Sequence, residues 1–275
     1  MTFAWGARTY VMGIVNVTPD SFSGDGLLRD AVEPGPSVVD QARRMVRDGA
    51  DLLDVGGEST RPGHEPVDEA QEIARVVPAI RAIREALPGV PISVDTTKPT
   101  VAEAALDAGA DCINDIWGVG PSDALPRLAA RRHVPYVLMH NRAEARYDDV
   151  VAEVVADLAR AIERAVAAGV PREAIVVDPG IGFGKTMAHN LALLRDLAAL
   201  QVLRRPILLG TSRKSTIGRV LGGVPAGERL EGTLATTALG IAAGTDIVRV
   251  HDVRENVRVA RMCDAILRTR EEVGG

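Results

Sequence analysis

Short, mostly apolar runs alternate along the chain with longer amphipathic stretches. The short runs are rich in Val, Ile and Leu and show little regular alternation between polar and apolar positions. Strands that are covered on both faces, as in parallel sheets flanked by helices, need this continuous apolar character. Eight runs are therefore predicted as strands, at residues 9–15, 51–55, 91–94, 111–113, 134–139, 174–177, 206–209 and 246–250.

Helices are predicted between these strands, because apolar residues there recur at spacings of three and four. They cover residues 37–48, 68–87, 100–108, 123–131, 148–168, 187–200, 228–243 and 253–268, with a short additional helix at 215–221. A repeated junction supports this pattern: Gly49-Ala50-Asp51, Gly109-Ala110-Asp111 and Gly244-Thr245-Asp246 each close a helix and open a strand. Glycine suits the left-handed position just past a helix end.

Eight such strand–helix units in about 250 residues favour a closed (β/α)8 TIM barrel over an open doubly wound sheet. No linker, charge block or low-complexity stretch divides the chain, so residues 1–275 are predicted to form one domain. The carboxyl ends of all strands in such a barrel meet at one face, which carries the active site. Two long irregular stretches, 18–36 and 60–67, follow the first two strands and are predicted to lie over this face.

Composition adds mainly exclusions. The 32 basic and 37 acidic residues give a net charge of -5, so there is no basic excess to indicate a nucleic-acid partner. The two cysteines, Cys112 and Cys263, form no pattern, which favours free thiols in a reducing compartment over a disulfide. No signal peptide or membrane-spanning stretch is recognisable, and a cytoplasmic protein is predicted.

Polar residues end several predicted strands, and three of them suit a flat nitrogen heterocycle. Asp95, Asn114 and Asp178 each follow an apolar run. A carboxylate accepts two parallel N–H bonds, and an amide supplies both a donor and an acceptor. Each of the three can instead cap the helix that follows it. Their occurrence at three separate strand ends favours a shared binding site.

Cationic residues after the last two predicted strands suit an anion. Lys214 follows the seventh strand, in the region of a barrel that commonly binds phosphate, although a solvated Arg-Lys pair is the alternative. Arg249 and His251 end the eighth strand, and alternation along a strand places both on one side. Together with Asn16, at the end of the first strand, and Arg61, in the second loop, they can hold a diphosphate and its metal ion.

The segment Gly180-Ile181-Gly182-Phe183-Gly184-Lys185-Thr186 is rich in glycine but lacks the spacing of a phosphate-binding loop. Pro179 stands where that loop needs its first glycine, and the preceding Asp178 would repel phosphate. We interpret the segment as a tight turn over the carboxyl face of the barrel, with Phe183 as a wall.

Taken together, these motifs closely resemble those of the dihydropteroate synthase family, which joins a dihydropterin to para-aminobenzoate. The matching segments run in order along the chain: Met12-Gly13-Ile14-Val15-Asn16-Val17-Thr18-Pro19-Asp20-Ser21-Phe22-Ser23, Asp54-Val55-Gly56-Gly57-Glu58-Ser59-Thr60-Arg61-Pro62-Gly63, Ser93-Val94-Asp95-Thr96, Ile113-Asn114-Asp115, Asp178-Pro179-Gly180-Ile181-Gly182-Phe183, Gly210-Thr211-Ser212-Arg213-Lys214-Ser215 and Arg249-Val250-His251-Asp252. The first two segments are long and specific. In the first loop Asp25 is displaced by one position from the family pattern.

The resemblance implies condensation of 6-hydroxymethyl-7,8-dihydropterin diphosphate with para-aminobenzoate to 7,8-dihydropteroate, in folate biosynthesis. Diphosphate leaves before the arylamine attacks, in an SN1-like reaction. The resemblance also implies a Mg²⁺ ion and a homodimer formed through the late helices. The implied roles are pterin binding by Asp95, Asn114, Asp178 and Lys214, a pocket lined by Met139 and Phe183 with Arg249 stacked on the ring, Mg²⁺ binding by Asn16, anion binding by Arg61, Arg249 and His251, amine and loop contacts by Phe22, Thr60, Pro62 and Ser215, and catalysis by Asp95, Lys214, Asn16 and Arg61.

Two alternatives remain open at this point. A pterin-binding methyltransferase acting on methyltetrahydrofolate has a similar barrel, but it has no diphosphate to hold. Phe22 and the pair Arg61-Pro62 therefore favour the synthase. A degenerate paralogue would bind pterin without condensing it, and the displaced Asp25 is the feature in its favour.

Overall fold

The computed structural model describes residues 3–17, 36–58 and 67–268. Its strands are β1 (Tyr10–Asn16), β2 (Leu52–Gly56), β3 (Ile92–Asp95), β4 (Cys112–Asp115), β5 (Tyr136–Met139), β6 (Ile175–Asp178), β7 (Leu208–Leu209) and β8 (Ile247–Val250). Its α-helices are α1 (Pro36–Arg47), α2 (Glu69–Ala86), α3 (Pro99–Asp107), α4 (Ala124–Arg132), α5 (Val150–Ala167), α6 (Met187–Arg195), α7 (Ser215–Val220), α8 (Leu230–Ala242) and α9 (Val253–Leu267).

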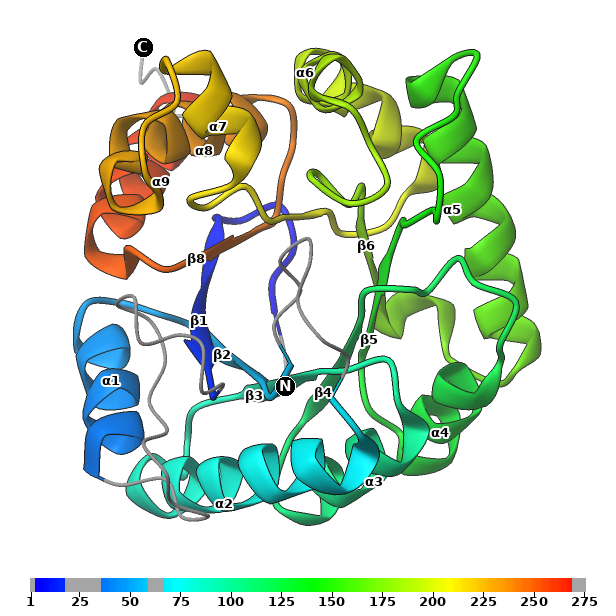
Figure 1. The fold of residues 1–275 in the computed structure, drawn as a ribbon, viewed down its shortest axis with the longest axis vertical. Coiled ribbons are helices and arrows are strands. Elements are labelled where there is room, and N and C mark those ends of the chain that lie inside the picture. The colour runs from blue at the N-terminus through cyan, green and yellow to red at the C-terminus, as the bar shows by residue number, and fades with distance from the viewer. Residues whose placement is uncertain (1–2, 18–35, 59–66, 269–275) are drawn as a thin grey trace, which may run out of the picture.

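The described strands form one parallel sheet in the order β6-β5-β4-β3-β2-β1-β8-β7. A parallel bridge between Val177 of β6 and Ile207, just before β7, joins the two edges. The sheet therefore closes on itself, and the helices surround it (Figure 1). The predicted (β/α)8 TIM barrel is confirmed.

The repeated junctions have the predicted geometry. Gly49, Gly109 and Gly244 have φ values of 104°, 111° and 98°, in the region that residues with a side chain rarely adopt. Gly169, between α5 and β6, has φ 104° and is a fourth junction of this kind that the sequence pattern did not single out.

The predicted helix over residues 187–200 is wrong in its second half. The helix α6 ends at Arg195, and the chain continues as a 3₁₀ helix over Leu197–Leu203. Leu197 and Leu200 are both buried, and their separation of three residues matches one turn of a 3₁₀ helix. An apolar spacing of three fits either helix type, so the sequence pattern could not distinguish them.

Strand alternation divides the apolar residues into two layers. Outward-facing residues such as Val55, Val94 and Ile113 pack with the helices in the main core. Inward-facing residues form a separate cluster, which consists of Tyr10, Met12, Leu52, Cys112, Val137, Val176, Leu208 and Ile247. This cluster fills the barrel axis, as in other barrels of this type.

The carboxyl face of the barrel lies directly above this inward-facing apolar cluster. Side chains two residues apart share one side of a strand, so the residues two positions after the members of this cluster also point inward. They include Asp54 after Leu52, Asn114 after Cys112, Asp178 after Val176 and Arg249 after Ile247. The inward face of these strands thus changes from apolar to polar between residues two positions apart.

Both cysteines are free, as predicted. In the described part of the chain, no helix has the length and apolar character needed to cross a bilayer.

Candidate active site

The register of the strands brings the predicted polar residues into one row. Asn16 of β1 pairs with Gly56 of β2, and Gly56 pairs with Asp95 of β3. Asp95 in turn pairs with Asn114 of β4. On the other side of the barrel Met139 of β5 pairs with Asp178 of β6. The residues predicted for metal and pterin binding therefore converge at the carboxyl ends of the strands.

An arginine from the last strand joins this row. Arg249 donates from Nε to Asp54 Oδ2 at 2.6 Å and from Nη2 to Asp95 Oδ2 at 2.7 Å. Asn114 Nδ2 donates to the same Asp54 oxygen at 3.1 Å. Asp54 thus holds both Arg249 and Asn114, which come from strands far apart in the sequence.

Asp54 was not predicted as a site residue, although it lies in one of the matching segments. Its side chain is completely buried in β2. A carboxylate within a strand that is apolar on both sides requires a buried cation or several hydrogen bonds. That requirement was the available signal, but the sequence could not identify Arg249 as the partner.

Removing the charge of Asp54 is expected to destabilise the fold. Asp54→Asn leaves the half-buried Arg249 with one carboxylate in place of two. Breaking a buried ion pair costs about 3 to 5 kcal/mol, and the partial exposure of Arg249 places the expected loss toward the lower value. Urea denaturation measures this loss. As a control, Asp107→Asn breaks an exposed pair with Arg132 and should cost less than about 1 kcal/mol. Equal losses in the two variants would contradict the central position of Asp54.

Asp178 and Lys214 form the second half of the site. Asp178 Oδ1 accepts a hydrogen bond from Gly180 N at 2.7 Å, which turns the chain immediately after β6. Lys214 donates to the carbonyl oxygen of Ile181, and its Nζ lies 4.6 Å from the centre of the Phe183 ring. The turn after β6 therefore bonds both groups: Gly180 N donates to the Asp178 carboxylate, and the Ile181 carbonyl oxygen accepts from Lys214.

A glycine connects the two halves. A Cβ atom on Gly210, at the end of β7, would lie 3.8 Å from Asp178 Oδ2 and 3.9 Å from Arg249 Cβ. Asp178 and Arg249 therefore lie on either side of the position that a Gly210 side chain would occupy, so they face the same space. Asp54 and Asp95 are linked to this space by their bonds with Arg249, and Asn114 is linked to it by its bond with Asp54.

The ionisable groups of this space are tuned by burial. Burial raises the pKa of Asp95 to about 7, and the Arg249 guanidinium opposes that shift. Burial also raises the pKa of Asp178, against the opposing charge of Lys214. Burial lowers the pKa of Lys214 to about 8, although Asp178 favours its charged form. Strongly perturbed groups gathered around one space are typical of a functional site.

The structure excludes both helix capping by the three strand-end residues and a solvated Arg213-Lys214 pair. The residues that precede α3, α4 and α6 are Lys98, Asp123 and Thr186, so Asp95, Asn114 and Asp178 are not helix caps. Nor are Arg213 and Lys214 a solvated pair. Arg213 bonds Asp252 at 2.7 Å, whereas Lys214 points into the site.

The remaining predicted residues are placed as follows. His251 Nδ1 lies 2.9 Å from Ser212 Oγ, which ties the end of β8 to the end of β7. Met139 is buried, Phe183 is half-buried, and Ser215 is exposed at the start of α7. The positions of Phe22, Asp25, Thr60, Arg61 and Pro62 lie outside the described residues. Asp115 accepts hydrogen bonds from the Tyr136 hydroxyl and Trp117 N, a structural role within β4 and its loop.

Comparison with known proteins identifies the family. The pterin binding enzyme family matches residues 12–251. A dihydropteroate synthase of Clostridium beijerinckii is 50% identical over 267 residues, which are 97% of each chain. The structure of dihydropteroate synthase from Clostridium difficile, determined in the presence of pteroic acid, is 48% identical and superposes with a TM-score of 0.91, covering 98% of this chain and 100% of that one. The structure of the Xanthomonas albilineans synthase with 4-aminobenzoic acid is 42% identical, with a TM-score of 0.89 and coverage of 96% and 95%. The chain therefore belongs to the pterin binding enzyme family and, within it, to the dihydropteroate synthases.

Proposed function

We propose that the carboxyl face of this barrel binds 6-hydroxymethyl-7,8-dihydropterin diphosphate and para-aminobenzoate and condenses them to 7,8-dihydropteroate and diphosphate. The chain is a dihydropteroate synthase, a transferase of folate biosynthesis. The observation that carries the proposal for the site is the common space bordered by Asp95, Asn114, Asp178, Lys214 and Arg249.

The pterin ring is proposed to lie between the two halves of the site. Asp178 and Asn114 offer acceptors and a donor to the polar edge of the ring. Lys214 donates from the side of β7, and Met139 and Phe183 provide apolar contact. Arg249 now bonds Asp95 through Nη2, so a ring that bonds Asp95 must share that carboxylate or displace this contact. A displaced guanidinium would remain tied to Asp54 and could stack on the ring.

The diphosphate is proposed to lie toward β1 and β8, near Asn16 and His251, with Arg61 as a further contact. Mg²⁺ prefers oxygen ligands, keeps several waters and is usually held by one or two protein groups together with substrate phosphates. The amide oxygen of Asn16, half-buried in the same row as Asp95, fits such a ligand. The described residues contain no group of three or more His, Cys, Asp or Glu that could hold a metal, and an ion that binds mainly to phosphate needs none. When bound, the ion would neutralise charge on the leaving diphosphate.

The chemistry of these residues is electrostatic. The bond between the pterin methylene carbon and the diphosphate oxygen breaks, and the electron pair leaves with diphosphate. Arg249, His251 and Arg61 favour this departure, while the Asp95 carboxylate stabilises the positive charge that develops on the pterin. The amine nitrogen of para-aminobenzoate then bonds to the carbon and releases a proton to solvent. Ser215 is proposed to contact the amine substrate, together with Phe22, Thr60 and Pro62.

One assay tests this proposal against its alternatives. The purified protein is mixed with the pterin diphosphate and para-aminobenzoate, with Mg²⁺ or with excess EDTA, and both diphosphate and dihydropteroate are measured. Product that depends on Mg²⁺ supports the synthase and its metal. Pterin binding without product would instead indicate a degenerate paralogue. In a separate reaction, methyl transfer from methyltetrahydrofolate would indicate the methyltransferase.

A homodimer through the late helices is also proposed. Leu239 of α8 and Met262 and Ile266 of α9 are 65%, 62% and 66% exposed. Large apolar side chains gathered on two neighbouring helices are typical of a protein interface. Light scattering should therefore give about twice the chain mass of 29.1 kDa, and Met262→Glu should shift the protein toward the monomer. A monomeric wild-type protein would contradict this interface. We further propose that residues 1–275 act as one domain and that the enzyme is cytoplasmic.

A further inference from the structure

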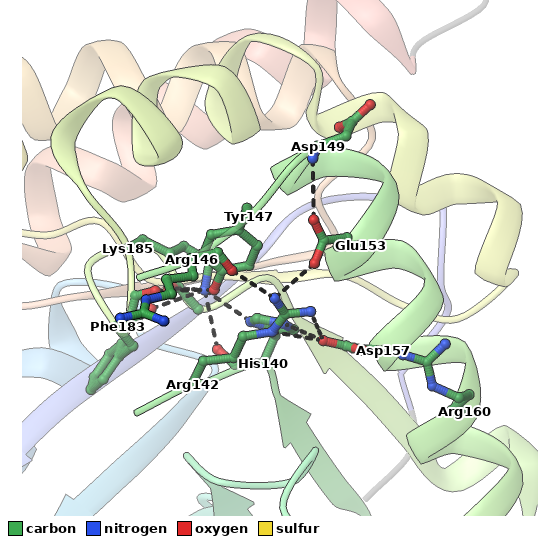
Figure 2. A network of polar contacts seen from close by, with 12 residues as sticks. His140, Arg142, Arg146, Tyr147, Asp149, Glu153, Asp157, Arg160, Phe183 and Lys185 are labelled. Carbon is green, nitrogen blue, oxygen red and sulfur yellow. Dashed lines mark hydrogen bonds and ion pairs between the residues drawn. The ribbon is translucent and has the colours of Figure 1, made fainter. Parts of the chain in front are cut away.

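A half-buried lysine, Lys185, lies beside the proposed pterin pocket, where the turn after β6 meets the turn after β5 (Figure 2). Lys185 Nζ lies 3.0 Å from the carbonyl oxygen of Gly180, 3.0 Å from that of Phe183 and 3.0 Å from His140 Nδ1. An ammonium group has three donors, and these three contacts use all of them. A longer contact of 3.4 Å reaches the carbonyl oxygen of His140.

The histidine that accepts from Lys185 is itself fixed. His140 is fully buried, and its Nε2 lies 3.1 Å from Asp157 Oδ2. Burial, reinforced by Lys185, lowers the pKa of His140 to about 4, so the ring is neutral with one donor and one acceptor. Nε2–H therefore donates to Asp157, and Nδ1 accepts from Lys185. Asp157 also accepts from Arg142 Nη2 at 2.7 Å (Figure 2).

The backbones of the two turns touch at this place. A Cβ atom on Gly180 would lie 1.8 Å from the carbonyl oxygen of His140, and one on Gly184 would lie 2.1 Å from that of Arg142. Both glycines have positive φ, at 67° and 53°. We call residues 140–142 and 180–185 the β5–β6 seam. The seam is closed by direct backbone contact, and Lys185 bonds to both of its sides.

The side of the seam that follows β6 carries groups of the proposed pterin pocket. Asp178 Oδ1 accepts from the N–H of Gly180, whose own carbonyl oxygen bonds Lys185. Phe183, whose ring lies beside Lys214, also bonds Lys185 through its carbonyl oxygen. Ile181, between them, provides the carbonyl oxygen that holds Lys214. A change in the shape of this turn would therefore move the carboxylate and the ammonium group together.

We propose that Lys185 is a positioning residue for the pterin pocket, because it bonds acceptors on both sides of the seam and so holds the turn that presents Asp178 and seats Lys214. This inference rests on the proposed function of that pocket. Lys185 acts through the turn and has no contact with substrate in this proposal. Its loss should therefore weaken pterin binding far more than it slows the reaction at saturating substrate.

The charge of Lys185 depends on its surroundings. Burial lowers the pKa of Lys185 to about 7, and Lys214 and Arg142 act in the same direction. The carboxylates of Asp178 and Asp157 oppose that shift. The test is therefore best made at about pH 6, where the amino group carries all three donors.

Lys185→Met keeps the aliphatic stem and removes the donors. We expect the Kd for 6-hydroxymethyl-7,8-dihydropterin diphosphate, measured by calorimetry, to rise about 10- to 100-fold, because the turn that presents Asp178 and Lys214 is no longer held. The KM for para-aminobenzoate should change less than about 2-fold, and kcat at saturating pterin should fall less than about 3-fold. A purely structural role would not produce this division between the two substrates.

Arg84→Met is the matched control. Arg84 also bonds several backbone carbonyl oxygens, those of Pro88, Val90 and Gly109, but it does so at the opposite end of the barrel. Arg84→Met should lower the melting temperature and leave the pterin affinity unchanged.

Two results would overturn the inference. One is wild-type pterin affinity in Lys185→Met, and the other is an equal loss of affinity in Lys185→Met and Arg84→Met. If the wild-type protein binds no pterin, the proposed function fails first, and the role of Lys185 fails with it. If Lys185→Met does not fold, Lys185→Gln, which keeps an amide with two donors, is judged by the same criteria.

Discussion

Lys214→Ala is expected to lower kcat/KM for the pterin substrate at least about 100-fold, a loss of about 3 kcal/mol of transition-state stabilisation. The Lys214 ammonium group bonds the carbonyl oxygen of Ile181 and lies against the ring of Phe183, facing the Asp178 side of the site. Its removal takes away the proposed donor to the substrate and leaves the buried Asp178 with less opposing charge. Steady-state release of diphosphate measures the effect.

The pH dependence of the wild-type enzyme gives a second view of Lys214. Burial lowers the pKa of Lys214 to about 8, so its ammonium form is lost as the pH rises through that value. The wild-type kcat/KM should therefore fall above about pH 8, because the charged form is the donor.

The control for Lys214→Ala is Arg219→Ala, which removes an exposed cation from α7. Its kcat/KM should stay within about 2-fold of wild type. A Lys214→Ala enzyme with near wild-type kcat/KM would refute the assigned pocket.

Asp178→Asn is expected to cost a similar factor, at least about 100-fold in kcat/KM. The substitution keeps the shape of the side chain but replaces an oxygen that accepts with an amide group that donates. Two N–H groups of a pterin edge could then no longer bond in parallel, and Lys214 would lose the carboxylate that favours its charged form. Pterin affinity should fall, while the KM for para-aminobenzoate should change little. Titration with each substrate separates the two effects.

A double-variant cycle links these two predictions. Because Asp178 and Lys214 influence each other directly, their combined loss should be smaller than the sum of the single losses in free energy. Asp196→Asn, at an exposed position after α6, should combine additively with Lys214→Ala. Full additivity of Asp178→Asn and Lys214→Ala would show that the two residues act in separate places.

Most of the fold was predictable because each element is set by a local pattern. Continuous apolar runs required strands covered on both faces, and glycines at the helix ends required left-handed turns. The structure agrees to within a few residues at nearly every element. The exceptions are short ones: the ladder of β7 is limited to Leu208 and Leu209, and residues 197–203 form a 3₁₀ helix. In the second of these places the apolar spacing of three, between Leu197 and Leu200, fits both an α-helix and a 3₁₀ helix.

By itself, the sequence determined the class of fold, the face that carries the site and the family, because apolar spacing, polar strand ends and long motifs are all written along the chain. Only the tertiary structure decided which charges meet. Arg249 bonds Asp54 across 195 positions, and Lys185 bonds His140 across 45. Such pairs depend on the register between strands and on where two turns touch, and both arise only when the barrel closes.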